Sequence, residues 1–233
     1  MFSLTAAETE ALLLSLKVAF WSVAASLPLA IALAGLLSRC EFPGKTLVDA
    51  LVHLPLVLPP VVVGYFLLVV LGRRGVIGAF LEEHLGITFA FRWTGAALAC
   101  AVMGLPLLVR AIRQSLDAVD RGLEAAAATL GASPPWVFAT VTLPLILPGI
   151  LTGMLLSFAR SLGEFGATIT FVSNIPGETQ TLPLAIYTFT QVPGGDAQAL
   201  RLCILSLLLS LGALMSSEIL LRRANVRAAG RDA

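Results

Sequence analysis

Charged side chains are scarce in this 233-residue chain: Asp, Glu, Lys and Arg together make up 12% of it. In a soluble domain of this size, about a quarter of the residues are charged. Hydrophobic residues reach 58%, and the mean hydropathy is +0.92. This combination predicts an integral membrane protein. The net charge of +1 gives no broad basic surface, so nucleic acid is not an expected partner.

The sequence also lacks the residue groupings of a metal site, a disulfide framework or a catalytic centre. Its three cysteines, Cys40, Cys100 and Cys203, are far apart, and its two histidines, His53 and His84, are isolated. We therefore expect no metal ligand and no catalytic residue in this chain. An intramembrane enzyme would need a set such as Ser/His or His/Asp, which is not visible.

A nucleotide-binding loop is missing as well. The triplet Gly44-Lys45-Thr46 looks like the end of a P-loop, but Arg39 stands where the first glycine is required. No strand pattern precedes it, so we interpret the triplet as a turn. We expect this chain to bind no cofactor itself, and any ATP and magnesium would be bound by another chain.

Long apolar runs are what the sequence has in abundance. A helix needs about 20 such residues to cross a bilayer. Five runs predict an all-α integral membrane protein that forms a single transmembrane domain over residues 1–233. The predicted spans lie at about 11–37, 47–71, 94–112, 143–163 and 199–221.

Two helix starts carry local signals. Thr5 and Glu8 are spaced as a capping box at the beginning of the first run. Thr181 and Pro183 suit the N-cap and the first turn of a short helix that ends near Gln191. This second helix is too short to cross a bilayer, so we expect it at the membrane interface.

The second of the five runs contains Pro55, Pro59 and Pro60. Proline inside a helix removes a hydrogen bond and clashes with the preceding turn, so we expect a kink or a local break. A broken backbone at membrane depth is tolerated only where it is buried in protein or lines a wet cavity. A simple kink is the plainer interpretation.

Basic residues predict the orientation of the spans, because cytoplasmic loops of membrane proteins are enriched in Lys and Arg. With the N-terminus outside, the cytoplasmic side holds Arg39, Lys45, Arg110, Arg113, Arg121, Arg222, Arg223, Arg227 and Arg231, against Arg73, Arg74, Arg92 and Arg201 outside. This excess predicts an outer N-terminus and a cytoplasmic C-terminus. It places a loop at 113–142 in the cytoplasm and a loop at 164–198 outside.

The cytoplasmic loop has a strong local pattern. Residues 117–130 are good helix formers, with Ala125–Ala128 at their centre. Gly131 suits the left-handed position that ends a helix, Ser133 is a candidate N-cap, and Pro134 suits a first helical position. We expect a helix, a sharp turn and a second helix. The small alanine face would allow another protein to approach closely; a turn without a partner is the alternative.

This loop resembles the cytoplasmic signature of ABC-importer permeases, which reads Glu-Ala-Ala, three residues, Gly, nine residues, Ile-x-Leu-Pro. Gly131, Val141 and Leu143-Pro144 match its spacing, with Val in place of Ile, while the glutamate stands one place early at Glu124. In that family the loop is a coupling helix that docks on the ATPase subunit. The resemblance implies an ATPase-coupling segment containing Glu124, Ala125, Ala126, Gly131, Ala132, Leu143 and Pro144.

A second stretch, FARSLGEFGATITFVSNIPGET at 158–179, resembles the molybdate branch of these permeases, and IYTFTQVPGG at 186–195 extends the resemblance. Sulfate permeases are near relatives, so sulfate or another oxyanion is the alternative cargo, and tungstate could accompany molybdate. The resemblance implies a type I ABC-importer permease fold in the bacterial inner (plasma) membrane. It also implies a second copy of the chain, two ATPase subunits and a periplasmic molybdate-binding protein as partners.

Within this stretch, Arg160 and Glu164 are four residues apart and can pair on one helix face. At about 1.5 Å per residue, Arg160 lies roughly 25 Å along its span, near the outer edge. A structural salt bridge and a role in the pathway are both open. Thr168, Ser173 and Asn174 could solvate a tetrahedral oxyanion weakly, as a transport path requires. We take these five residues as a candidate pathway or outer gate; ordinary loop polarity is the alternative for the last three.

Two further patterns bear on assembly and class. Gly149, Gly153, Ser157 and Ser161 recur every four residues and predict close packing against another helix, within the chain or between subunits. A stand-alone channel or ion-coupled transporter would need its own gate or acids deep in a span. Glu164 lies near an edge, which counts against that class.

Overall fold

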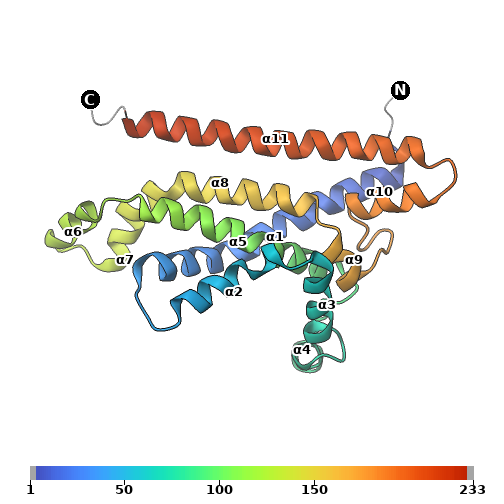
Figure 1. The fold of residues 1–233 in the computed structure, drawn as a ribbon, viewed down its shortest axis with the longest axis horizontal. Helices are drawn as coiled ribbons and strands as arrows, with labels where there is room; N and C mark the ends of the chain where they lie inside the picture. The colour runs from blue at the N-terminus through green and yellow to red at the C-terminus, as the bar shows by residue number, and fades with distance from the viewer. Residues whose placement is uncertain (1–3, 230–233) are drawn as a thin grey trace.

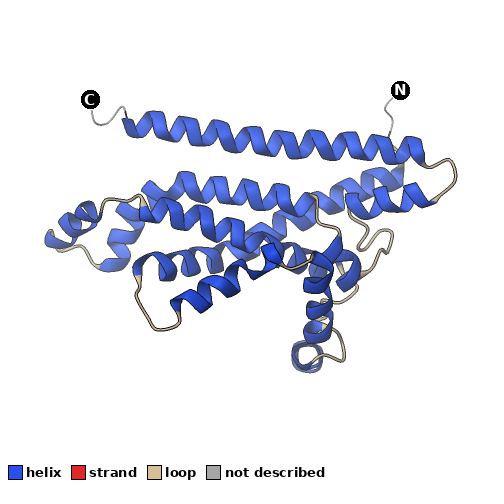
Figure 2. Ribbon diagram, viewed as in Figure 1, coloured by secondary structure: helices blue, strands red, loops and turns tan. Residues whose placement is uncertain are grey.

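The computed structural model describes residues 4–229, without the side chains of Ser217 and residues 220–229. Arg231 therefore lies outside the described residues, and the side chains of Arg222, Arg223 and Arg227 are not described. All regular elements in the described range are helices (Figure 2), which confirms the all-α prediction. They are α1 (Ala6–Arg39), α2 (Lys45–Val57), α3 (Pro60–Leu71), α4 (Val76–Leu85), α5 (Trp93–Asp117), α6 (Arg121–Thr129), α7 (Pro134–Val137), the π-helix η1 (Phe138–Thr142), α8 (Leu143–Leu162), α9 (Gly166–Val172), α10 (Leu182–Gln191) and α11 (Asp196–Ala229).

Four stretches of the described chain are helices long and apolar enough to cross a membrane. They are Ala6–Arg39, Trp93–Asp117, Pro134–Leu162 and Asp196–Ser216, and each contains or largely overlaps one predicted span. The remaining predicted span, 47–71, is divided between α2 and α3, which are bent by 114° relative to each other. The described chain thus has four helices that are long and apolar enough to span a membrane, or five such spans if the bent pair counts as one.

Of the two alternatives for the second run, the structure shows the local break, and the plainer interpretation as a simple kink is wrong. Leu58 and Pro59 both adopt extended backbone, with ψ of 142° and 132°. Each precedes a proline, and the proline ring disfavours helical geometry in the residue before it. Two consecutive extended residues redirect the chain, and Pro60 then takes the first position of α3, where its missing N–H costs nothing. Pro55 stays inside α2.

The centre of the molecule is a bundle of α1, α5 and α8, in which α5 packs against both of the others (Figure 1). The small residues of α8 make this possible. A Cβ at Gly149 would overlap Ser115 of α5, and the hydroxyl groups of Ser161 and Ser22 lie 3.0 Å apart across α8 and α1. The small-residue pattern is thus used for packing within the chain.

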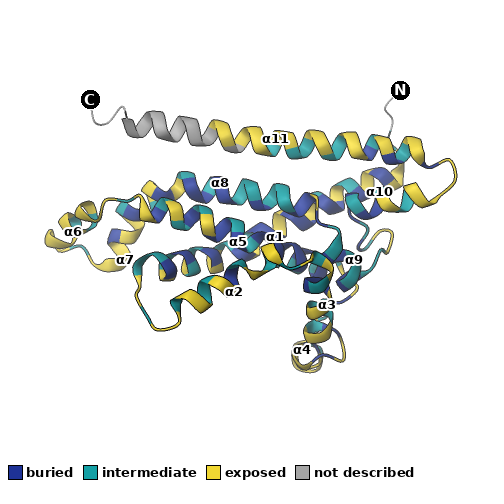
Figure 3. Cartoon of the chain, in the orientation of Figure 1, coloured by how far each residue is buried: buried dark blue, intermediate teal, exposed yellow. Residues whose placement is uncertain are grey.

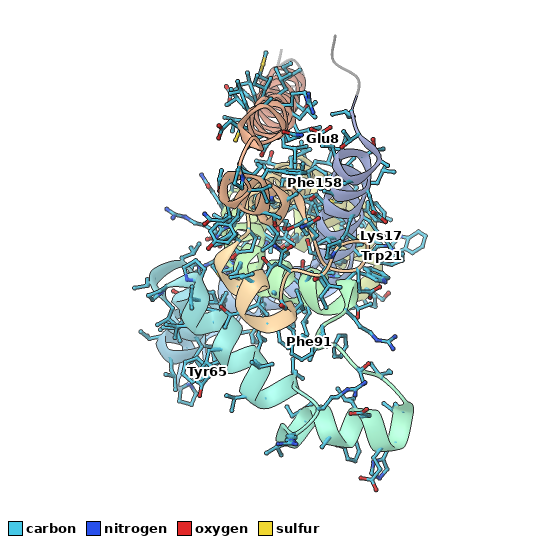
Figure 4. All side chains as sticks on the ribbon, turned by 90° about the vertical axis from the view of Figure 1, so that its right-hand side faces the viewer. Glu8, Lys17, Trp21, Tyr65, Phe91 and Phe158 are labelled. Atoms are coloured by element: carbon cyan, nitrogen blue, oxygen red, sulfur yellow. The ribbon has the colours of Figure 1, made fainter. Side chains whose placement is uncertain are left out.

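The two longest helices are joined near their first turns. Thr5 and Glu8 form a capping box at the start of α1, in which Thr5 N donates to Glu8 at 2.6 Å. The other carboxylate oxygen of Glu8 accepts from Arg201 of α11 at 2.8 and 3.1 Å. Glu8 is fully buried and faces α11 (Figure 4). This contact between a buried carboxylate and a partly exposed guanidinium joins the beginning of α11 to α1.

One part of the chain projects from the bundle. The helices α3 and α4 extend away from α1, α5 and α8 (Figure 1), and α4 lies across the end of α3 with Tyr65 pointing outward (Figure 4). Their apolar side chains are largely exposed, as are those along α11 (Figure 3). No element was predicted between the spans at 47–71 and 94–112, so α4 was missed.

Candidate functional site

The predicted coupling segment begins with a short helix whose ends are determined by local hydrogen bonds. Asp120 is the N-cap of α6 and accepts from the backbone of Gly122 at 2.8 Å. The helix ends in a Schellman arrangement, in which Gly131 N donates to Ala128 O at 3.0 Å and Ala132 N donates to Ala127 O at 3.3 Å. Gly131 has φ of +87°, as predicted, with open space around it. The glycine is required for its backbone angle alone.

The expected helix over 117–130 is interrupted. α5 runs to Asp117, and residues 118–120 form a turn before α6 starts at Arg121. Asp120 causes this restart, because its carboxylate satisfies the first free N–H groups of a new helix better than it would inside a longer one. The turn lets α6 change direction relative to α5.

The second half of the segment is continuous with the next span. α7 starts at Pro134 after Ser133, as the pattern predicts, but the helix then passes through the π turn Phe138–Thr142 into α8 without a break. Pro144 cannot donate to the residue four positions before it, and its ring crowds that carbonyl. A local change to π geometry relieves both problems.

Glu124 links α6 to two other parts of the chain. Its Oε1 lies 3.0 Å from Arg39 Nη2 at the end of α1 and accepts from Thr142 Oγ1 of the π turn at 2.6 Å. One carboxylate thus joins α6, α1 and the base of α8. Beside it lies a cavity of about 430 Å³, lined also by Ala132 and Phe138.

The outward face of the segment is small and apolar. Ala125 and Ala126 are exposed, while the larger side chains of Leu130 and Trp136 are 89% and 64% exposed. Leu143 is half-buried and packs on the core shared by α1, α5 and α8, and Pro144 is exposed. Glu124 therefore points inward to the chain, whereas its alanine neighbours present a surface that another protein can contact.

The second candidate group lies at the opposite end of α8. Arg160 Nη1 and Glu164 Oε2 are 2.7 Å apart, which shows the predicted pair. The side chain of Glu164 is 1% exposed, and its Oε1 accepts from the backbone N–H of Ala167 at 2.8 Å. Glu164 thus joins the end of α8 to the start of α9 across the break at Gly163.

The other three predicted pathway residues are engaged in hydrogen bonds within the chain. Thr168 is buried, and its hydroxyl donates to Phe165 O at 2.9 Å. Asn174 Nδ2 donates to Thr188 of α10 at 2.8 Å. Ser173 ends α9 with φ of +66°, and its carbonyl accepts from Thr179. Thr168 stabilises a helix, and the other two fix the outer loop.

Sequence reasoning missed the contact between the two broken segments. After the break following α2, α3 packs against α9, which itself follows the break at Gly163. A Cβ on Gly64 would stand 2.5 Å from the carbonyl oxygen of Ala167, and a Cβ on Gly166 would stand 2.8 Å from Pro60. Two glycines in the sequence, Gly64 after the proline break and Gly166 after Gly163, allow this close packing. The sequence does not show that they face each other's segment, because that contact depends on the tertiary fold.

Comparison with known proteins gives a consistent picture. The family described as "Binding-protein-dependent transport system inner membrane component" matches residues 26–226. The molybdenum transport system permease protein ModB of Escherichia coli K12 is 62% identical over 225 residues, covering 97% of this chain and 98% of that protein. The sulfate transport system permease protein CysW of Synechococcus elongatus is 38% identical over 177 residues, covering 76% and 62%.

Among solved structures, a bacterial ABC transporter involved in the import of the acidic polysaccharide alginate superimposes with a TM-score of 0.72. The match covers 94% of this chain and 80% of the other, at 17% identity. At this identity the likeness establishes the fold alone.

Proposed function

Because the chain belongs to the family of binding-protein-dependent transport system inner membrane components, we infer that it is the permease subunit of an ATP-driven importer for molybdate. The observation that carries this assignment is the 62% identity to a molybdenum permease across nearly the whole of both chains. The sulfate permease is less identical to this chain, at 38%, and the match covers 76% of the chain instead of 97%. Tungstate, with the same charge and tetrahedral geometry, is the second expected cargo.

The fold supports the finer topology that we propose. Counting α2 and α3 as one broken span gives five spans. The first turns of α1 and α11 lie at the end of the molecule that holds α10, and α6 lies at the opposite end (Figure 1). With the coupling segment in the cytoplasm, the N-terminus is outside and α11 runs inward. The location is the bacterial inner membrane, as the family description implies.

The proposed assembly is a type I importer with two copies of this chain, two ATPase subunits and a periplasmic molybdate-binding protein. A second copy is implied by the resemblance to type I importers, and the exposed apolar side chains of α3 and α11 are available to contact either lipid or that copy. ATP and magnesium would bind to the ATPase subunits. Closure of the ATPase pair would move the two coupling segments, and the spans would then open to the outside.

The transport test uses proteoliposomes containing this chain, its ATPase and the binding protein. We expect uptake of radioactive molybdate that requires ATP, is inhibited by vanadate and is competed by tungstate much more strongly than by sulfate. Uptake without ATP would identify a stand-alone channel instead, and uptake driven by a proton or sodium gradient would identify an ion-coupled transporter. Equal competition by sulfate would overturn the cargo assignment.

The docking role of the coupling segment has a separate test. Ala126 is exposed on α6, so Ala126→Trp adds bulk to the surface facing the proposed ATPase without disturbing the core. We expect the variant to insert into the membrane but to lose copurification of the ATPase and uptake. Val76→Trp, on the exposed face of α4, is the matched control and should retain both. Normal uptake by Ala126→Trp would contradict docking at this surface.

A further inference from the structure

A polar cavity of about 520 Å³ opens between α2 and α5, separate from the coupling segment and from Glu164. Its lining is charged or polar throughout and consists of Asp49, His53, Arg110, Arg113, Gln114 and Asp117. Four of these lie on α5 at positions 110, 113, 114 and 117, the spacing that places side chains on one helix face. This concentration stands out in a chain with so few charges.

Both carboxylates of the cavity already have partners. Arg113 Nη1 lies 2.9 Å from Asp49 Oδ1, and Arg113 Nε lies 3.8 Å from Asp117 Oδ2. Ser38 also donates to Asp117. His53 Nδ1 lies 2.8 Å from the Asp49 carbonyl oxygen. The negative charges of the cavity are therefore turned toward Arg113.

Arg110 is different: within the part of the chain that the structure describes, its guanidinium has no hydrogen bond and no ion pair. It is exposed and lies seven residues before the end of α5, about 10 Å along the helix axis. The pattern of basic residues assigns Arg110 to the cytoplasmic side, where a guanidinium faces water or lipid headgroups. Its five N–H donors form a fork that matches tetrahedral oxyanions.

We propose that this cavity is an oxyanion site at the cytoplasmic end of the transport path, where Arg110 binds the anion before it is released. Gln114 supplies a further hydrogen-bond donor at the rim. A single solvent-accessible guanidinium gives the weak binding that conduction requires, because a tight site would delay release. The assignment of the anion as transported molybdate rests on the proposed function. The phosphate of an anionic lipid headgroup has the same chemistry and is the other source of the ligand.

The test measures the electrostatic field in the cavity. The nucleotide-free complex is prepared in nanodiscs of zwitterionic lipid, in a background carrying Cys40→Ser, Cys100→Ala and Cys203→Ser. Gln114→Cys then introduces a single thiol beside Arg110. The rates at which this thiol reacts with an anionic and with a cationic methanethiosulfonate are compared. We expect Arg110→Gln to lower the anionic-to-cationic rate ratio roughly tenfold, as removal of one nearby charge should.

Two variants serve as controls. Arg110→Lys keeps the charge and should keep the ratio, which guards against a folding defect as the cause. Arg74→Gln removes an exposed arginine beyond α3 and should leave the ratio unchanged. An unchanged ratio in Arg110→Gln would overturn the proposal, because Arg110 would then not set the field of this cavity.

Ligand competition distinguishes the two sources. Millimolar molybdate should slow the reaction of the anionic reagent with the introduced thiol severalfold when Arg110 is present, and should have no effect in Arg110→Gln. Protection by phosphatidylglycerol nanodiscs, with no added effect of molybdate, would assign the site to lipid and overturn the release role. Protection by neither would overturn the site.

The outcome is separable from that of the transport assignment. Uptake by the unmodified complex is measured in parallel with the labelling. If uptake occurs while molybdate fails to protect the introduced thiol, the release site fails and the proposed function stands. If the complex does not take up molybdate, the proposed function fails whatever the labelling shows.

Discussion

Arg39 and Glu124 are 85 positions apart in the sequence, yet Arg39 Nη2 lies 3.0 Å from Glu124 Oε1. The contact ties the last turn of α1 to the helix that faces the proposed ATPase. Glu124 is thus used inside the chain, and it orients α6 rather than presenting its charge outward. The displaced position of this glutamate in the sequence signature agrees with that inward role.

Replacing Arg39 by Gln should loosen the coupling helix without preventing assembly. The ion pair is partly exposed, so its loss costs at most about 1 kcal/mol of folding free energy. We expect normal membrane levels and ATPase binding, with uptake per ATP hydrolysed reduced severalfold. Lys45→Gln, which breaks the exposed pair with Glu41, is the matched control. Unchanged coupling in Arg39→Gln would show that the contact has no role in transmission.

Gly131→Ala should destabilise the chain through backbone strain. The residue has φ of +87° and open space around it, so the cost is the left-handed conformation, about 1 kcal/mol. Gly212→Ala is the control: Gly212 is helical, also has open space, and should be neutral or slightly stabilising. Thermal unfolding in detergent measures both. Equal melting temperatures for the two variants would contradict the strain argument.

Gly64→Ala should separate α3 from α9. Its Cβ would stand 2.5 Å from the carbonyl oxygen of Ala167, a backbone atom that cannot move independently. We expect a loss of about 1–3 kcal/mol, typical of overpacking, and a marked fall in uptake. Gly35→Ala, with no atom within 4 Å of the new methyl group, should leave both near normal. Tolerance of Gly64→Ala would show that the two segments separate easily.

Exchange of the charges at Arg160 and Glu164 should not restore transport. Glu164 accepts from the N–H of Ala167 as well as pairing with Arg160, and an arginine at this position cannot accept. Glu164 is buried and Arg160 is partly exposed, so breaking the pair costs about 1–3 kcal/mol. Glu164→Gln keeps an acceptor and should be milder than Glu164→Ala in thermal unfolding and uptake. Full recovery of uptake in the exchanged variant would show that only the ion pair matters and that the hydrogen bond to Ala167 does not.

The proposed orientation predicts where a new thiol can be labelled. In the cysteine-free background, Ala233→Cys should react with a membrane-impermeant maleimide in inside-out vesicles and remain unlabelled in intact cells. Gly177→Cys, in the outer loop, should show the opposite pattern and serves as the control. Labelling of Ala233→Cys in intact cells would refute the cytoplasmic C-terminus.

Features that depend on neighbouring residues were predicted from the sequence. The capping box at Thr5, the left-handed Gly131 and the short helix after Thr181 were all predicted from neighbouring residues and are present in the structure. Each depends on atoms within about four positions along the chain, so the sequence determines it directly. The same is true of Arg160 and Glu164, whose separation alone allows the pair.

Features that depend on contacts between distant segments could not be predicted from the sequence. Proline placement indicated a disturbance in the second run, but the bend of 114° is stabilised by packing of α3 on α9, about 100 residues later. The partners of Glu124 come from α1 and the π turn, and no spacing rule joins them. For the same reason, the polar cavity between α2 and α5 was not anticipated from either helix alone.

The π turn at Phe138–Thr142 determines how α7 is rotated about the helix axis relative to α8. An additional residue in a helical turn rotates everything beyond it by about 100° relative to an uninterrupted α-helix. The surface formed by Trp136 and its neighbours therefore points in a direction fixed by this turn, not by α8 alone. A shift from π to α geometry would therefore swing that surface around the helix axis while α8 stayed in place.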